Sequence, residues 1–291
     1  MAEAAYSEGE WTSADGLTLR YRDYPARIGA GGDRPPLLCL PGLTRNCRDF
    51  EPVAAAFAGE WRVMAIDLRG RGQSDYARDP ASYVPLQYAA DVAMLLDQAG
   101  IDRVVAIGTS LGGVVTMLLA MAAPERIAAA VLNDIGPEVE AAGLARIRDY
   151  VGQGRSFATW MHAARGLREQ GAVAYPDFAI SDWLRLAKRL MVVGPGGRIA
   201  FDYDMRIAEP FNRPEGTGAV DMWPVFKPLA GRPVLALRGE LSDILSVATL
   251  ERMGRELKGL QAVTVPRVGH APTLEEPAAR RGIAALLAKV A

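Results

Sequence analysis

Short apolar runs alternate with amphipathic stretches along the first half of the chain. The apolar runs occupy residues 36–40, 62–68, 103–108 and 127–133. Stretches with a helical pattern lie between them, at residues 50–58, 85–99 and 111–123. Continuous apolar runs rich in β-branched residues are typical of strands covered on both faces. The alternation therefore predicts βαβ units built on a parallel sheet.

Two further runs precede this region and predict a hairpin. Residues 10–13 and 17–24 flank the pair Asp15-Gly16. An Asp-Gly pair suits the positive φ angles of a tight hairpin turn. These two runs are therefore predicted to form an antiparallel hairpin.

The pattern changes in the middle of the chain. Between about residues 137 and 223 strand-like runs disappear, and helical pieces alternate with Gly, Pro and Arg. Strand signals return at residues 233–238 and 262–266, and a helix closes the chain from about residue 277 to 290. A structureless loop of this length is uncommon in a compact domain. We predict that residues 1–135 and 224–291 form an α/β core, and that residues 136–223 form a helical cap inserted into it.

Composition and charge narrow the choice of partner. Half of the residues are hydrophobic, and the formal net charge is −1 with both signs mixed along the chain. A basic stripe for nucleic acid or for an anionic membrane is therefore not expected. We predict a small-molecule substrate, with neither nucleic acid nor membrane as partner, for a monomer or homodimer.

The N-terminal residues and the cysteines bear on the compartment. The first residues lack the basic start and apolar core of a secretory signal, which predicts a cytoplasmic protein. Cys39 and Cys47 are too few for a disulfide framework or a metal site. We therefore predict no bound metal.

The strongest chemical signal is the run Gly108-Thr109-Ser110-Leu111-Gly112. It lies between an apolar strand and an apolar helix, which is the setting that gives G-x-S-x-G its mechanical meaning. The glycines allow a sharp turn that lifts the hydroxyl to the end of the strand. This pattern predicts Ser110 as a nucleophile.

A serine hydroxyl needs a base, and the chain has only two histidines, His162 and His270. His162 lies in the predicted insertion. His270 follows the last strand signal, in a loop near the carboxyl end of the sheet. We predict His270 as the base.

The acid that orients this histidine is expected beside a strand end. Asp243 follows a strand that ends in Gly239, just before the histidine loop, and it is our prediction. Glu240 is nearer to the strand, and Asp134 follows an earlier strand. Both remain alternatives.

Backbone donors are expected to stabilise a tetrahedral intermediate. The Pro41-Gly42 turn closes a strand and would aim the N–H of Leu43 across the site. The N–H of Leu111 follows the nucleophile directly. We predict these two groups as an oxyanion hole.

Five segments in the same order resemble the α/β-hydrolase superfamily across nearly the whole chain. They are LPGLTRN, the D-x-R-G-x-G-x-S run at residues 67–74, GTSLGG, RGELSD and VGHAPTLEEP. The resemblance implies a mostly parallel eight-stranded sheet with helices on both faces and a helical cap after the sixth strand. It also implies a structural role for residues 67–74. The first segment has Pro41 where many members have histidine, which removes a side chain that often supports that loop. Asp134 occupies a position that some relatives use for the acid.

The predicted function is a serine hydrolase that cleaves a small, partly apolar carboxylic ester through an acyl-serine intermediate, and this hydrolase chemistry predicts no cofactor. One alternative is a carbon–carbon bond hydrolase or an enol-lactonase of aromatic degradation, since members of those groups resemble this chain in cap placement and triad. Thr109 departs from the asparagine common there. A second alternative is a non-catalytic ligand-binding protein on the same fold. Trp160, Met161 and Trp183 are candidates to line a substrate pocket, although ordinary packing explains such a cluster equally well.

Overall fold

The structure is a computed structural model that describes residues 5–27, 34–212 and 221–290. Eight strands form one sheet in the order β1-β2-β4-β3-β5-β6-β10-β11. Their bounds are β1 Ser7–Thr12, β2 Thr18–Tyr24, β3 Leu37–Leu40, β4 Val63–Asp67, β5 Val104–Thr109, β6 Ile127–Asn133, β10 Val234–Gly239 and β11 Gln261–Val265. β1, β2 and β4 pair antiparallel, and every pair from β4 to β11 is parallel. The predicted fold is confirmed.

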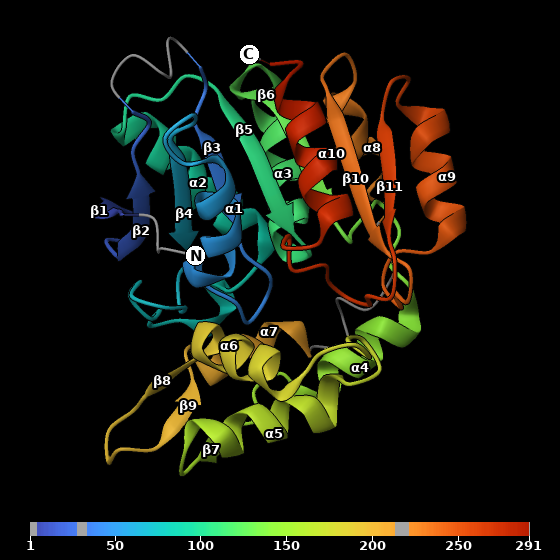
Figure 1. Cartoon of the computed structure of the whole chain (residues 1–291). Coiled ribbons are helices and arrows are strands. Elements are labelled where there is room, and N and C mark those ends of the chain that lie inside the picture. The colour runs from blue at the N-terminus through green and yellow to red at the C-terminus, as the bar shows by residue number, and fades with distance from the viewer. Residues whose placement is uncertain (1–4, 28–33, 213–220, 291) are drawn as a thin grey trace.

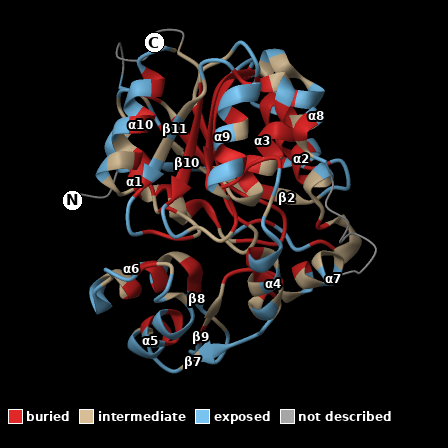
Figure 2. Ribbon diagram, turned by 90° about the vertical axis from the view of Figure 1, so that its right-hand side faces the viewer, coloured by how far each residue is buried: buried red, intermediate tan, exposed pale blue. Residues whose placement is uncertain are grey.

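Helices cover both faces of this sheet because its strands are apolar on both sides. In β3, Leu38 and Leu40 belong to one buried cluster, and Leu37 and Cys39 belong to the other. The first cluster includes side chains of α2 (Pro85–Gln98), α3 (Leu111–Ala122), α8 (Trp223–Phe226) and α9 (Val247–Glu256). The second includes side chains of α1 (Glu51–Phe57) and α10 (Pro277–Leu287). Figure 2 shows the buried strands between these two helical layers.

The segment between β6 and β10 lies across one end of the sheet. Figure 1 shows its elements beyond the end toward which the arrows of β5 and β10 point. The α-helices among its described residues are α4 (Ala141–Tyr150), α5 (Trp160–Gly171), α6 (Ile180–Leu190) and α7 (Ala208–Phe211). We call residues 136–222 the inserted segment. Positions 213–220 of the predicted cap lie outside the described residues, and its last residue, Trp223, begins α8, which contacts α3.

The inserted segment also contains a small sheet that the hydrophobic pattern did not predict. β7 (Ser156–Phe157), β9 (Ile199–Phe201) and β8 (Met191–Val193) pair antiparallel in that order. Strands of two or three residues are too short to show an alternating pattern. Because the inserted segment contains these three strands, the prediction that it has none is wrong.

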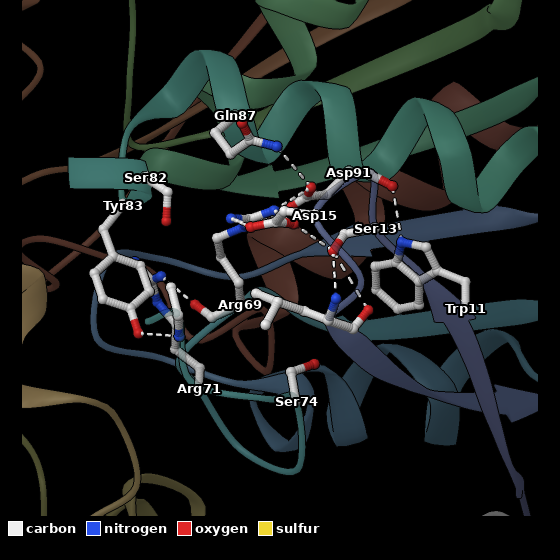
Figure 3. A network of polar contacts seen from close by, with 12 residues as sticks. Trp11, Ser13, Asp15, Arg69, Arg71, Ser74, Ser82, Tyr83, Gln87 and Asp91 are labelled. Atoms are coloured by element: carbon white, nitrogen blue, oxygen red, sulfur yellow. Dashed lines mark hydrogen bonds and ion pairs between the residues drawn. The ribbon is translucent and has the colours of Figure 1, made fainter. Parts of the chain in front are cut away.

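The run at residues 67–74 forms a buried polar network near the N-terminal hairpin. Figure 3 shows Arg69 between Asp91 of α2 and Asp15 of the β1–β2 turn. The Arg69 Nε lies 2.6 Å from an oxygen of Asp91, and its Nη1 lies 2.9 Å from an oxygen of Asp15. The Arg69 carbonyl accepts a hydrogen bond of 2.6 Å from Nη1 of Arg71, whose guanidinium lies over the ring of Tyr88. The contacts are internal to the fold, so the run serves as a structural turn.

Two searches of the described residues bear on membranes and metals. None of the helices in the described ranges has both the length and the apolar content needed to cross a bilayer. Within residues 5–27, 34–212 and 221–290, no group of three or more His, Cys, Asp and Glu side chains is arranged to hold a metal ion.

Candidate active site

Ser110 lies in a tight turn between β5 and α3. Its φ of 51° and ψ of −115° place it in a region that residues with a side chain rarely adopt. A Cβ added at Gly108 would lie 2.3 Å from the carbonyl oxygen of Gly112, and one added at Gly112 would lie 2.0 Å from the carbonyl oxygen of Leu40. Only glycine fits at both positions, which is why the strand and helix can approach so closely around Ser110.

His270 connects the serine to a buried carboxylate. Its Nε2 lies 2.9 Å from the Ser110 Oγ, and its Nδ1 lies 2.8 Å from an Oδ of Asp134. The side chain of His270 is 8% exposed and that of Asp134 is fully buried. The structure therefore brings Ser110 and His270 together as predicted, in a hydrogen-bonded chain that ends at Asp134.

Asp134 is held in place by donors from the loop after β10. One of its oxygens accepts a hydrogen bond of 2.8 Å from the Gly239 N–H, and the other accepts one of 2.7 Å from the Ser242 hydroxyl. The Asp134 N–H donates to the carbonyl of Leu237 at 2.8 Å. A buried carboxylate with this many donors has a fixed orientation. It therefore presents its remaining acceptor site to His270.

The prediction that Asp243 contacts the base is wrong. Asp243 instead forms an ion pair with Arg146, with oxygens 2.5 Å from Nε and 2.8 Å from Nη2. Hydrogen bonds from Arg146 hold the pKa of Asp243 below its usual value. The loop after β10 turns Ser242, one residue earlier, toward Asp134. Glu240 is engaged elsewhere too, since it accepts a hydrogen bond of 2.7 Å from the N–H of Arg267.

Asn133 is a site residue that the sequence reasoning missed. The side-chain Nδ2 of Asn133 donates to the Thr109 hydroxyl at 3.0 Å and to the Pro272 carbonyl at 2.8 Å. The backbone carbonyl of Asn133 accepts a hydrogen bond of 3.0 Å from the Ser110 N–H. This one side chain joins the strand before the serine to the loop that carries His270. A polar residue at the end of the apolar run IAAAVLN is the signal that could have indicated it.

The two predicted backbone donors lie on segments that border Ser110. Leu111 is the first residue of α3, where a backbone N–H has no partner within the helix. A Cβ at Gly42 would lie 3.8 Å from the Cβ of Ser110, so the loop that holds Leu43 approaches the serine closely. The buried Arg71 donates a hydrogen bond of 2.9 Å to the Leu43 carbonyl and so holds this loop in place.

A cavity of about 450 Å³ opens beside Ser110 and His270. Residues of the core and of the inserted segment line it, including Leu43, Arg45, Arg146, Tyr150, Leu167, Tyr175, Trp183, Leu186, Phe201 and Asp243. Among the predicted pocket residues, Trp183 lines this cavity and is 2% exposed. Trp160 and Met161 do not line it. Trp160 packs against the second core cluster, and Met161 is exposed at the start of α5.

Comparison with known proteins places these observations in a family. A family model described as alpha/beta hydrolase fold matches residues 35–277. The 3-hydroxybutyrate-oligomer hydrolase of Cupriavidus necator is 35% identical over 249 residues, which cover 83% of this chain and 84% of that protein. The 2-(acetamidomethylene)succinate hydrolase of Mesorhizobium japonicum is 26% identical over 242 residues, which cover 82% of each chain. The crystal structure of an alpha/beta hydrolase from Novosphingobium aromaticivorans is 60% identical, with a TM-score of 0.93 and full coverage of both chains.

Proposed function

We propose that this chain, a hydrolase that belongs to the alpha/beta hydrolase family, cleaves a small, partly apolar carboxylic ester through an acyl-serine intermediate. The observation that carries the proposal is the hydrogen-bonded chain from Ser110 through His270 to the buried Asp134. Ser110 and His270 border the cavity, so a bound ester can reach the serine hydroxyl.

In the first half of the reaction, the Ser110 Oγ attacks the ester carbonyl carbon while its proton passes to Nε2 of His270. Asp134 accepts the Nδ1–H of His270, which fixes the tautomer and stabilises the imidazolium that forms. Asp134, in place of Asp243, therefore takes the role of the acid in this proposal. The carbonyl π electrons move onto oxygen and produce the tetrahedral oxyanion.

The oxyanion is bound by the N–H groups of Leu43 and Leu111, each of which is worth a few kcal/mol of barrier in comparable sites. Collapse of the intermediate breaks the bond to the alcohol oxygen, which takes the proton from His270. A water molecule then attacks the acyl-serine and gives its proton to His270. The second collapse releases the acid and returns the proton to Ser110.

The cavity and one relative support a small ester as substrate. A volume of about 450 Å³ is within the range of small-molecule sites. The inserted segment supplies part of the lining, and we propose that it caps the site and excludes water from the bound ester. An oligomer of 3-hydroxybutyrate is itself an ester. The hydrolase activity of the Cupriavidus necator relative on such oligomers therefore supports ester cleavage by this chain.

The test is the reaction of the protein with a fluorophosphonate and with a p-nitrophenyl ester. We expect the reagent to modify Ser110, as located by peptide mass, and Ser110→Ala to lose label and at least about 10⁴-fold in ester turnover. Ser181→Ala changes an exposed serine of α6 and serves as the matched control.

Three other outcomes would argue against the proposal. Turnover that survives in Ser110→Ala would remove the serine from the mechanism. Turnover of a dienone acid or an enol-lactone, with no ester cleaved, would favour a carbon–carbon hydrolase or an enol-lactonase. Binding of small ligands by a folded protein that neither reacts nor turns over would favour a ligand-binding protein.

A further inference from the structure

Two arginines in the cavity are held in the same way from two parts of the chain. Arg45 lies in the loop after β3, and its Nε and Nη2 contact the oxygens of Asp49 at 2.5 and 2.8 Å. Arg146 lies in α4, and its Nε and Nη2 contact the oxygens of Asp243 at the same two distances. All four residues line the cavity beside Ser110.

This geometry leaves part of each guanidinium outside its ion pair. A bidentate contact through Nε and Nη2 fixes the plane of the guanidinium and does not use the two N–H groups of Nη1. The side chains of Arg45 and Arg146 are 26% and 41% exposed, respectively. Each aspartate therefore orients an arginine that can still donate hydrogen bonds to a bound molecule.

Tyr150 lines the same cavity as the two arginines. Burial raises the pKa of Tyr150, while the charges of Arg146 and Arg45 oppose that rise. Tyr150 follows Arg146 by four residues in α4, so the two side chains lie on the same face of that helix. The Tyr150 hydroxyl stays protonated at neutral pH and adds a further donor to the cavity wall.

The cavity lining carries charges of both signs. The lining includes four arginines, Arg45, Arg146, Arg155 and Arg189, and three aspartates, Asp49, Asp149 and Asp243. It includes neither lysine nor glutamate among the described residues. Arg189 is paired with Glu275 at 2.6 Å, which offsets the one positive charge by which arginines outnumber aspartates in the lining. A carboxylate is favoured by the N–H groups of Nη1 of Arg45 and Arg146, because guanidinium groups bind planar carboxylates with specific geometry.

We propose that Arg45, Arg146 and Tyr150 form a carboxylate-binding subsite, so that the preferred substrate is an ester that also bears a free carboxylate. This inference rests on the proposed ester hydrolysis and names the class of ester. The subsite holds the carboxylate while the ester carbonyl reaches Ser110. The aspartates orient the arginines and take no part in the chemistry.

The test compares two esters of matched length, mono-p-nitrophenyl adipate and p-nitrophenyl heptanoate. We expect kcat/KM to be higher for the adipate in the wild type. The paired change Arg146→Gln with Asp243→Asn removes the guanidinium without leaving a lone charge, and Arg45→Gln with Asp49→Asn does the same for the other arginine. Each should lower kcat/KM about 10- to 100-fold for the adipate, and less than about threefold for the heptanoate. Tyr150→Phe should show the same selectivity with a smaller loss.

The matched control is Arg185→Gln with Asp182→Asn, an ion pair of α6 whose members do not line the cavity. It should leave both rates unchanged. Equal losses on the two esters in the cavity variants, or a wild type that does not prefer the adipate, would overturn the subsite while leaving ester hydrolysis in place.

A binding measurement tests the subsite separately from catalysis. In Ser110→Ala protein, calorimetry with monomethyl adipate and dimethyl adipate should show tighter binding of the monoester, and this difference should disappear in the arginine variants. If the wild type cleaves no ester but this binding pattern is observed, the proposed function fails and the subsite stands. Equal affinity for the two compounds in the Ser110→Ala protein would overturn the subsite.

Discussion

The loops after β6 and β10 each carry an aspartate at the end of the sheet where His270 lies, and the two carboxylates differ in burial and in hydrogen-bond partners. Asp134 is fully buried and accepts hydrogen bonds from Gly239, Ser242 and His270. Asp243 is 36% exposed and is engaged by Arg146. Arg146 is the main reason that the pKa of Asp243 is lowered, and the charge of His270 contributes in the same direction. Asp243 and His270 line the same cavity, but only Asp134 accepts a hydrogen bond from His270.

The largest expected effect separates these two aspartates by activity. Asp134→Asn keeps the size of the side chain but removes the charge that stabilises the imidazolium, so we expect kcat for a neutral ester to fall about 10⁴-fold. Asp243→Asn should lower it less than about tenfold. Steady-state kinetics on p-nitrophenyl heptanoate would measure both. A larger loss in Asp243→Asn than in Asp134→Asn would reverse the assignment.

A second prediction tests how firmly the loop after β6 is tied to the histidine loop. Asn133→Ala removes the donors to Thr109 and Pro272 and leaves the buried Pro272 carbonyl without this partner. We expect the free energy of unfolding to fall by about 1–3 kcal/mol, and ester turnover to fall with it because His270 loses support. Urea denaturation and steady-state kinetics would measure the two effects.

The comparison variant for this prediction is Thr109→Val, which removes only one of the two hydrogen bonds. It should cost less stability than Asn133→Ala and leave His270 in place. If the two variants were equally stable and equally active, the contact with Pro272 would contribute nothing.

The smallest expected effect concerns the contribution of the Asp243–Arg146 ion pair to the free energy of unfolding. The pKa of Asp243 is lower in the folded protein than its usual value, so the folded state is stabilised above the unfolded pKa. That stabilisation is lost as the pH falls through the folded pKa. The pair is more than a third exposed, and solvent screening limits it to about 0.5 kcal/mol. Asp243→Asn should therefore reduce the free energy of unfolding slightly at pH 7, with a difference that shrinks below about pH 4. Urea denaturation at several pH values would show this, and a difference that grows toward acid pH would contradict it.

Much of this site could be predicted from the sequence because its signals are local. The glycines around Ser110 and the scarcity of histidine led to the two residues that the structure places 2.9 Å apart. The acid could not be chosen in this way, since both aspartates follow a strand. The choice depends on a turn after Gly239 that directs Ser242 toward Asp134. That turn is a tertiary property, and strand endings alone do not reveal it.

In the fold too, features with a local sequence signal were predicted and features without one were not. Apolar runs predicted the parallel strands β3, β4, β5, β6 and β10, because each of these runs fills a buried strand. The full eight-stranded sheet was implied by the resemblance to the α/β-hydrolase superfamily. The β7-β9-β8 sheet escaped prediction because its strands hold only two or three residues. The pocket residues Trp160 and Met161 were misplaced because a helical stripe shows which face is apolar without showing what covers it.

The most direct test of the central claim is a proton NMR spectrum of the His270 Nδ1–H. The chain has only two histidines, so a His162→Gln variant assigns the signal. A proton shared with a buried carboxylate resonates far downfield of the backbone amides. We predict that this resonance is present in the wild type, persists in Asp243→Asn, and moves upfield or disappears in Asp134→Asn. A resonance that survives in Asp134→Asn and is lost in Asp243→Asn would contradict the account.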